Sequence, residues 1–317
     1  MISLTKDGQY QTMKLIDIAD LDCIHLTYDE PNAEENWVKI KNMVPWARRV
    51  DGVNGSDAAH KAAADASTTD RFVLIDGDNI PDPIFFNLTL EVDEVCVYRW
   101  RARNHINGLM YGNGGLSVWS KEFVYAMRTH EASDGSVEND VEFCFYPNYY
   151  AMHDCYSTTY PNGSAFQAWR AGFREGVKMC LNKGARPTLQ EFKQRVHQRN
   201  LDHLTIWHNV GRDVDNGIWA IAGARMGTYM TMITPQWDYR TVQDFEQLER
   251  LWETVKDDNP EMLAGRVAED LATQLDLPLT TILGPESAFF KQHYRSDWHN
   301  LGVMVKEMDI IRSQEGW

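Results

Sequence analysis

A short apolar run that stops at two aspartates limits the folds open to this chain. Residues 72–75 read Phe-Val-Leu-Ile, and Asp76, Gly77 and Asp78 follow them directly. A strand without polar residues is typical of a parallel sheet that helices cover on both faces. Because ligands of open α/β sheets bind at the carboxyl ends of strands, we expect the two aspartates at a ligand-binding edge.

The first half of the chain alternates strand-like and helix-like stretches. We predict strands at residues 23–28, 47–50, 72–75 and 95–99, and helices at residues 34–43 and 58–66 with Ser56 as N-cap. This order predicts an α/β fold with an open mixed sheet flanked by helices.

The second half shows few strand signals. Helices are predicted at residues 166–181, 189–198, 242–255 (after Thr241 as N-cap) and 261–274, and residues 161–164 form the start signal of the first. We therefore expect two parts, an α/β domain at residues 1–158 and a mainly helical C-terminal module at residues 159–317.

Charge and cysteine content narrow the class of protein. The chain has 31 Lys and Arg against 46 Asp and Glu, a net charge of −15, which speaks against a general nucleic-acid binder. Residues 165–212 nevertheless carry nine basic and three acidic residues, and such a stretch can face a phosphate-bearing ligand. The five cysteines form no CxxC pair, and we find no signal peptide or membrane span, so we expect a cytoplasmic protein with free thiols and no membrane insertion.

The Asp76-Gly77-Asp78 turn is the strongest candidate for chemistry. Two carboxylates one residue apart on an extended chain point to the same side, which is costly without a cation. Mg²⁺ or Mn²⁺ takes oxygen ligands of this kind and stabilises a departing diphosphate, and Gly77 leaves room for a ligand. The alternative is an ordinary surface turn, since Asp-Gly is common in turns.

Residues 51–79 resemble the nucleotide-binding half of GT-A glycosyltransferases, above all the family-2-like group. That family has the form N-x-G-x-x-x-A-R-N before its DxD motif; here Asn54-Gly55 begins a looser version, in which Ala59-His60-Lys61 replaces Ala-Arg-Asn. The resemblance covers roughly residues 20–155. It implies a GT-A-like, Rossmann-like domain that binds a nucleotide-sugar donor.

The resemblance also implies roles for individual residues. Tyr28, Asp29 and Asp51 would line the base and ribose site, His60 and Lys61 would contact the donor, and Asp76, Asp78 and His153 would bind the metal. The glycine-rich turn Asn113-Gly114-Gly115 would lie beside the donor sugar and the acceptor.

An acidic cluster at residues 138–142 supplies the candidate general base of an inverting enzyme. Val141 and Phe143 read as core-facing, which puts Asp140 on the opposite side, and Glu138 is the second choice. A retaining mechanism would remove this role from Asp140. A solvated acidic turn is the other interpretation of the cluster.

Two further segments carry basic or aromatic residues. Arg170, Arg174 and Lys178 recur at four-residue spacing on one helix face and can grip phosphates; a salt-bridged structural helix is the alternative. The same segment and residues 210–219 resemble phage-encoded GT-A-like proteins, some of which transfer sugars onto hydroxymethylated pyrimidines in DNA. That resemblance implies DNA as acceptor and a host-cell cytoplasm. Residues 98–103 can assist by stacking and phosphate contact, or form an edge strand with a solvated face.

Together these features favour a metal-dependent glycosyltransferase, with a UDP-sugar as the preferred donor. The chain has no Walker A motif, no GxGxxG after a strand, no HExxH and no GxSxG. Two alternatives stay open: a nucleotidyltransferase of the sugar-nucleotide type, and a non-catalytic α/β binding protein.

Overall fold

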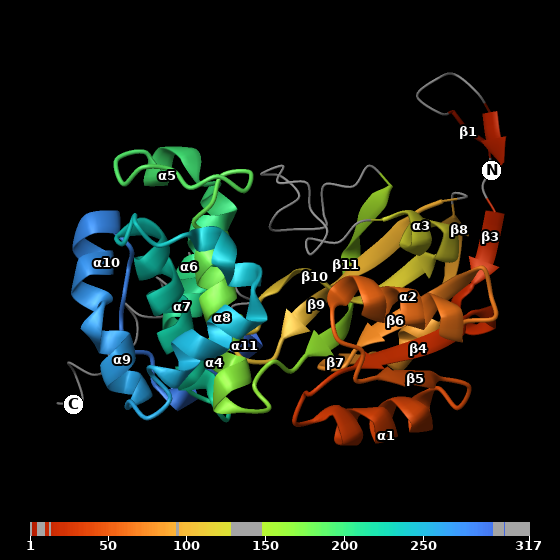
Figure 1. Cartoon of the computed structure of the whole chain (residues 1–317), viewed down its shortest axis with the longest axis horizontal. Coiled ribbons are helices and arrows are strands. Elements are labelled where there is room, and N and C mark those ends of the chain that lie inside the picture. Colours follow the sequence, from red (N-terminus) through yellow and green to blue (C-terminus); the bar gives the residue numbers. More distant parts are fainter. Residues whose placement is uncertain are drawn as a thin grey trace. The chain divides into compact units, whose positions relative to one another are not determined.

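A computed structural model describes residues 2–4, 10–12, 14–92, 95–127, 148–293 and 301. The chain divides into two compact units. We call the first the sheet unit, which holds the described residues up to 103 together with residues 111–127 and 148–159. The helical unit holds residues 104–110 and the described residues from 160 onward (Figure 1).

The described strands of the sheet unit build one large sheet and two small ones. The large sheet has the order β5 (Arg48–Asp51), β4 (Asp22–Thr27), β6 (Arg71–Asp76), β10 (Met110–Ser120), β9 (Val97–Asn104), β11 (Tyr149–Thr159) and β7 (Asn79–Pro81). The small sheets pair β1 (Ile2–Leu4) with β2 (Tyr10–Thr12) and β3 (Lys14–Asp17) with β8 (Thr89–Val92). Short 3₁₀ helices cover Ile18–Asp20 and Pro83–Asn87.

The large sheet is mixed and open, as predicted. β4 runs parallel to both β5 and β6, whereas β10 is antiparallel to β6 and β11 is antiparallel to β7. Helices flank it: α1 (Ala33–Met43), α2 (Ser56–Ala66) and α3 (Lys121–Ala126) (Figure 1). The chain therefore has a mixed α/β architecture with a curled open sheet.

The apolar run in β6 is buried on both faces of the sheet. Val73 and Ile75 belong to a core cluster that also takes residues of α1, whereas Phe72 and Leu74 pack in a second cluster with residues of α2 and α3. Each of these four side chains is at most 1% exposed. Period-two alternation between two covered faces explains why residues 72–75 of β6, between Arg71 and Asp76, are all apolar.

The described residues of the helical unit after Thr159 form helices and no named strand. They are α4 (Ala165–Lys178), α5 (Phe192–Arg195), α6 (Gln198–Asn209), α7 (Gly217–Met232), η5 (Tyr239–Gln243), α8 (Phe245–Glu253), α9 (Pro260–Arg266), α10 (Ala268–Leu275) and α11 (Gly284–His293). Among the described residues, no helix combines the length and apolarity that crossing a membrane requires.

Several predicted helix boundaries were wrong. The N-cap of α2 is Gly55, whose φ of 91° suits glycine, and Ser56 is already helical. The side chain of Asp244, not of Thr241, caps α8 by accepting a hydrogen bond from the backbone of Gln247. Ser164 does cap α4, by accepting from Gln167, so the predicted start signal is confirmed.

Helices α4 and α7 pack unusually closely. Gly172 and Gly176 on α4 lie against α7, and Gly223 and Gly227 on α7 lie against α4. A Cβ atom on any of the four would come within 2.0–2.3 Å of a backbone carbonyl oxygen of the other helix. Glycines four residues apart on both helices therefore let the two backbones touch, as in small-residue helix interfaces generally.

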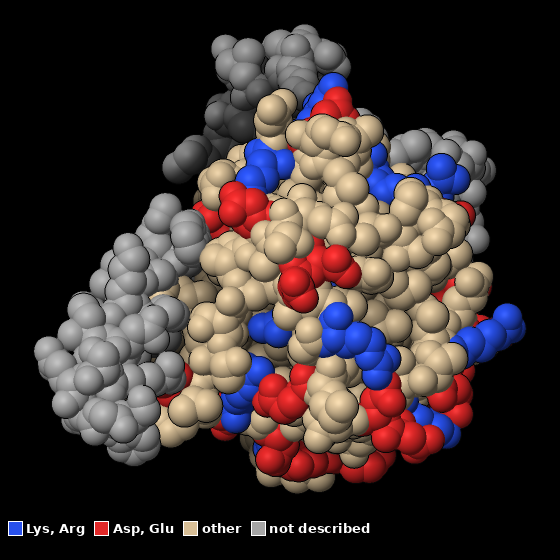
Figure 2. Space-filling model, turned by 90° about the vertical axis from the view of Figure 1, so that its left-hand side faces the viewer, with Lys and Arg blue, Asp and Glu red and all other residues tan. Residues whose placement is uncertain are grey.

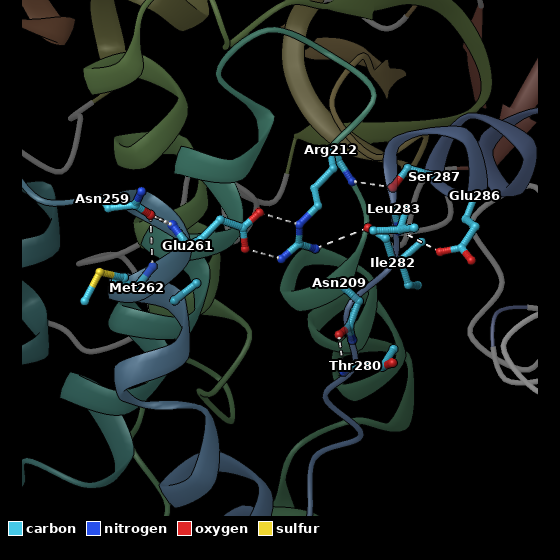
Figure 3. Close-up of polar contacts among 12 residues, drawn as sticks. Asn209, Arg212, Asn259, Glu261, Met262, Thr280, Ile282, Leu283, Glu286 and Ser287 are labelled. Carbon is cyan, nitrogen blue, oxygen red and sulfur yellow. Dashed lines mark hydrogen bonds and ion pairs between the residues drawn. The ribbon is translucent and has the colours of Figure 1, made fainter. Parts of the chain in front are cut away.

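A polar network ties the C-terminal segments of the helical unit together (Figure 3). Arg212 donates two parallel hydrogen bonds of 2.8 Å to the carboxylate of Glu261 on α9, and a third to the carbonyl of Ile282. The side chain of Asn209 accepts from the backbone of Thr280, and Ser287 accepts from the backbone of Gly211. Bidentate arginine–carboxylate pairing fixes geometry as well as charge, so this network orients α9 and the start of α11.

Candidate active site

The strand order of the large sheet reverses between β4 and β6. The chain leaves β4 through α1 to β5 on one side, then returns through α2 to β6 on the other side of β4. Ligands of open α/β sheets bind outside the carboxyl ends of strands at such a reversal. Residues 28–30 follow β4 and residues 76–78 end β6, and Leu26 pairs with Asp76, so both segments meet at this edge.

A third carboxylate, that of Glu30, joins the two aspartates. Its Oε2 accepts a hydrogen bond of 2.8 Å from the backbone of Tyr28, and the carboxylate lies over Gly77. A Cβ atom at residue 77 would come within 2.7 Å of Oε2 of Glu30. The group that lies close to Gly77 in this structure is therefore Glu30, whereas the sequence predicts room for a ligand there.

Negative charge is concentrated at this edge. Burial, and then the charges of Asp78 and Glu30, raise the pKa of Asp76 to about 8. Asp78 accepts a hydrogen bond of 3.1 Å from the hydroxyl of Thr159. Such a group is suited to a cation, because a nearby positive charge would offset both the burial and the repulsion that favour protonated Asp76. Within the described ranges, no three His, Cys, Asp or Glu side chains are arranged to hold a metal ion by themselves.

Buried polar residues support the turn from beneath. The side-chain amide of Asn36, on α1, donates a hydrogen bond of 2.8 Å to the carbonyl of Gly77 and is 2% exposed. His25, on β4, is fully buried and stacks on Trp37 with ring centroids 5.9 Å apart. Burial, and then the charge of Arg49, lower the pKa of His25 to about 4, so this imidazole is neutral near pH 7.

Asn36→Ala is expected to destabilise the sheet unit by about 2 kcal/mol, because it leaves the buried carbonyl of Gly77 without its donor. Asn87→Ala, at an exposed asparagine of the same unit, is the matched control and should change stability by less than about 0.5 kcal/mol. Urea unfolding of both variants measures the difference. Equal midpoints for the two variants would show that the amide does not hold the turn.

Asp51, Tyr28 and Asp29 also lie at this edge. Asp51 ends β5 and accepts hydrogen bonds from the hydroxyl of Thr27 and, at 2.9 Å, from the guanidinium of Arg49. The bond from Thr27, together with the nearby charge of Arg49, keeps the pKa of Asp51 below its usual range. Tyr28 and Asp29 are exposed in the turn after β4. The carboxyl ends of β4, β5 and β6 thus carry six residues predicted for the site: Tyr28, Asp29, Asp51, Asp76, Gly77 and Asp78.

The glycine-rich segment is a strand, not the predicted turn. Asn113, Gly114 and Gly115 lie within β10. Leu116 pairs with Ile75 in the antiparallel register between β10 and β6. Gly115, the residue before Leu116, therefore lies at about the level of Asp76. The segment therefore borders the candidate site as an extended backbone.

His60 and Lys61 make contacts close to their own helix. The Nδ1 of His60 bonds to the carbonyl of Ser56 at 2.7 Å, and its ring meets the edge of Trp119 at 5.0 Å. Lys61 forms an ion pair of 2.5 Å with Asp57, one helical turn earlier. These contacts give both residues roles in holding α2, which differ from the donor contacts that the resemblance implies.

His153 is not brought to the aspartate pair. It is exposed on β11, where its Nδ1 lies 3.1 Å from Nη2 of Arg101. Thr159, which bonds to Asp78, is six residues further along the same strand, and six residues of extended chain span about 20 Å. A shared metal ion would need ligands within about 2–3 Å of the ion, so His153 cannot complete this site.

The predicted base and the predicted basic helix are both outside the described part of the sheet unit. Asp140 and Glu138 are outside the described residues. Arg170 and Arg174 belong to α4 in the helical unit, where their guanidinium groups stack on the ring of Phe245 at 5.1 and 5.4 Å. Stacking of this kind holds the side chains against the helix surface.

The basic stretch at residues 165–212 is partly neutralised by local carboxylates. At least four of its nine cations have acidic partners: Lys178 with Glu175, Lys193 with Asp276, Arg195 with Glu191, and Arg212 with Glu261. On the face that Figure 2 shows, Lys and Arg side chains are interspersed with Asp and Glu. The sequence count of nine basic against three acidic residues therefore does not describe an unopposed basic surface.

Sequence reasoning missed three residues that shape the site: Glu30, Asn36 and Thr159. Glu30 directly follows the predicted Asp29, so the two adjacent acidic residues could have indicated that Glu30 also belongs to the site. Asn36 and Thr159 reach the turn from residues 41 and 81 positions away, and no sequence pattern marks such contacts.

Comparisons with known proteins do not identify this chain. No protein-family model, no curated protein and no solved structure matches it. Function must therefore be inferred from the side chains at the acidic edge of the sheet.

Proposed function

We propose that this protein is a metal-dependent glycosyltransferase that moves a sugar from a nucleotide-sugar donor, preferably a UDP-sugar, to an acceptor hydroxyl. The observation that carries the proposal is the position of Asp76 and Asp78. They lie at the reversal of strand order, beside Glu30, and the pKa of Asp76 is raised to about 8. Protein sites that hold two carboxylates this close are commonly cation sites.

Asp76 and Asp78 are the residues that would hold Mn²⁺ or Mg²⁺. Two protein carboxylates suffice, since Mg²⁺ keeps several water or phosphate ligands when bound by proteins. When bound, the cation neutralises the charge that develops on a departing nucleoside diphosphate. Thr159 positions Asp78 by its hydrogen bond, and Glu30 covers Gly77.

The remaining assignments follow from the same edge. Tyr28, Asp29 and Asp51 take the base and ribose, and the backbone at Gly115 borders the donor sugar. Asp140, with Glu138 as reserve, is the base that removes the acceptor proton if the enzyme inverts configuration. The parallel β5-β4-β6 half supports a GT-A-like fold, since the resemblance of the sequence falls on this half. DNA carrying hydroxymethylated pyrimidines is the acceptor we favour, which would place the enzyme in a host cytoplasm.

Thermal unfolding with UDP-, GDP-, ADP- and CMP-sugars, each with and without Mn²⁺, tests the proposal. A donor at one hundred times its dissociation constant should add about 2.7 kcal/mol of stability, and only when Mn²⁺ is present. Asp76→Ala/Asp78→Ala should abolish this gain, whereas Asp20→Asn, at an exposed aspartate of the same unit, should keep it.

Two outcomes would count against the proposal. Stabilisation that survives Asp76→Ala/Asp78→Ala would place the donor elsewhere. No stabilisation by any donor would favour the non-catalytic binding protein. A nucleotidyltransferase would share the metal dependence but would release pyrophosphate from a nucleoside triphosphate, which a product assay distinguishes from sugar transfer.

A further inference from the structure

Strand β9 carries three arginines on one face of the large sheet. Arg99, Arg101 and Arg103 alternate with side chains that are at most 6% exposed. β9 lies between β10 and β11, so it is an interior strand. The alternative of an edge strand at residues 98–103 is therefore wrong. Side chains two residues apart on a strand lie about 6.6 Å apart, and the three arginines form a line of cations about 13 Å long. We call these residues the arginine row.

The contacts of Arg99 and Arg101 are with aromatic and imidazole groups. The guanidinium of Arg99 lies 4.7 Å from the ring centroid of Tyr149 and donates a hydrogen bond of 3.1 Å to its hydroxyl. Arg101 donates to Nδ1 of His153 at 3.1 Å. Within the described ranges, neither arginine forms an ion pair with a carboxylate. Their positive charges are therefore not neutralised by a carboxylate within the part of the chain that the structure describes.

The strands on either side leave the arginine row accessible. On β10, Gly112 faces Arg99 so closely that a Cβ atom would lie 2.8 Å from Nη2, and glycine places no side chain there. On β11, Ala151 and His153 are exposed. Arg103 is exposed at the far end of the row. Arg99 and Arg101 are half-buried, so a ligand can reach their exposed parts together with Arg103 and the imidazole ring of His153.

The arginine row also lies near the candidate active site within the same unit. Gly115 is at about the level of Asp76, and Gly112, beside Arg99, is three residues further along β10. Three residues of extended chain span about 10 Å. Along β10, the guanidinium of Arg99 thus lies about 10 Å from the level of Asp76.

We propose that the arginine row binds successive phosphates of a nucleic-acid strand, while the exposed ring of His153 stacks on a base. A line of evenly spaced cations suits a linear polyanion better than a single phosphate or diphosphate, which would engage one or two of them. Arginines that track a backbone beside rings that stack bases are the usual means of binding single strands. Only the further step, that this strand is the sugar acceptor, rests on the proposed function.

Fluorescence anisotropy with a labelled single-stranded DNA of about twelve nucleotides tests the binding directly. The titrations use the full chain in EDTA without any donor, at several salt concentrations between about 50 and 200 mM. Arg99→Gln/Arg101→Gln should weaken binding by about tenfold. It should also reduce the magnitude of the slope of log K against log salt by about 1.4, because each of the two lost phosphate contacts contributes about 0.7 on a single strand.

Arg250→Gln/Arg266→Gln is the matched control, because it removes the same charge at two exposed arginines that are paired with Glu246 and Asp258. It should leave affinity and slope unchanged. Arg99→Lys/Arg101→Lys keeps the charge and should keep the slope, so it remains informative if the glutamine variant misfolds.

Three outcomes would overturn the inference. They are no binding by the wild type at about 50 mM salt, an equal loss in the control variant, and equal affinity for an abasic strand or heparin, which would indicate a general polyanion surface. Asp76→Ala/Asp78→Ala should bind the DNA like the wild type. Failure of donor stabilisation and failure of DNA binding are therefore observed separately.

Discussion

Gly223→Ala is expected to destabilise the helical unit by about 2 kcal/mol, although alanine is the better helix former. The new methyl carbon would lie 2.1 Å from the backbone carbonyl oxygen of Trp169 on α4, a distance that no ordinary contact allows. Overpacking in a well-packed interior costs about 1–3 kcal/mol, and here the obstacle is backbone that cannot rotate away. The gain in helix propensity, about 1 kcal/mol, offsets only part of this cost.

The reciprocal arrangement strengthens this expectation. Gly172 on α4 would place its own methyl carbon 2.0 Å from the carbonyl oxygen of Ala220, so Gly172→Ala should have a similar effect. Either change must push α4 and α7 apart, which disturbs Trp169 and Phe173, both fully buried at this interface. Because the loss arises from one shared separation of the helices, the double variant should cost less than the sum of the two single variants.

Gly265→Ala is the matched control. Gly265 lies in α9, and no atom lies within 4 Å of the place that the alanine methyl carbon would take, so this change should raise stability by up to about 1 kcal/mol. Urea unfolding followed by tryptophan fluorescence compares the three variants. If Gly223→Ala and Gly265→Ala both stabilise the protein, the close contact between α4 and α7 is refuted.

The sheet could be predicted because its signals are local. The apolar run of β6, the Ala-rich helix before it and the aspartates after it each lie within a few residues, and together they indicate strand, helix and turn. The pairing of β10 is different. Its glycines favour a turn by composition, but their position between β6 and β9 supplies backbone hydrogen-bond partners, and this tertiary context outweighs the weak strand propensity of glycine.

The helical unit was harder to predict, and α7 shows why. Eleven of its sixteen residues are buried, including its glycines and Arg225, so it has no polar stripe to alternate with an apolar one. A helix that is enclosed on all sides gives no amphipathic period. The predicted helix at residues 189–198 is also wrong, since α5 covers only residues 192–195 and Gln198 already begins the separate helix α6, which His197 caps.

The candidate site was predictable only in its acidic residues. Asp76 and Asp78 follow a recognisable strand, so their place at the sheet edge could be inferred before the structure. The residues that bond to this turn are brought there by strand register and helix packing. Thr159 contacts Asp78 because β11 pairs with β7, and Asn36 contacts Gly77 from α1. Register of this kind is set by pairing across the whole sheet and not by any local motif.

Asp76→Asn is expected to become increasingly more stable than the metal-free wild type as the pH rises from about 4 to about 8. Folded Asp76 keeps its proton up to about pH 8, whereas an unfolded aspartate loses it near pH 4. At this residue the folded state therefore holds more protons across the window, and the contribution of Asp76 to stability falls as the pH rises through it. Asparagine carries no charge at any of these pH values, so residue 76 of the variant does not reduce the stability as the pH rises.

Melting temperatures of both proteins in EDTA between about pH 4 and pH 9 measure the effect. The curves should lie close together near pH 4 and separate progressively toward pH 8, with the variant more stable, while Asp20→Asn follows the wild type. Adding Mn²⁺ should then raise the melting temperature of the wild type at pH 8 and leave Asp76→Asn nearly unchanged, because the charge that repels Asp78 and Glu30 is the charge that would bind the ion. Parallel pH curves for the wild type and Asp76→Asn would mean that the pKa of Asp76 is not raised. The main observation in favour of a cation site at the acidic edge would then be wrong.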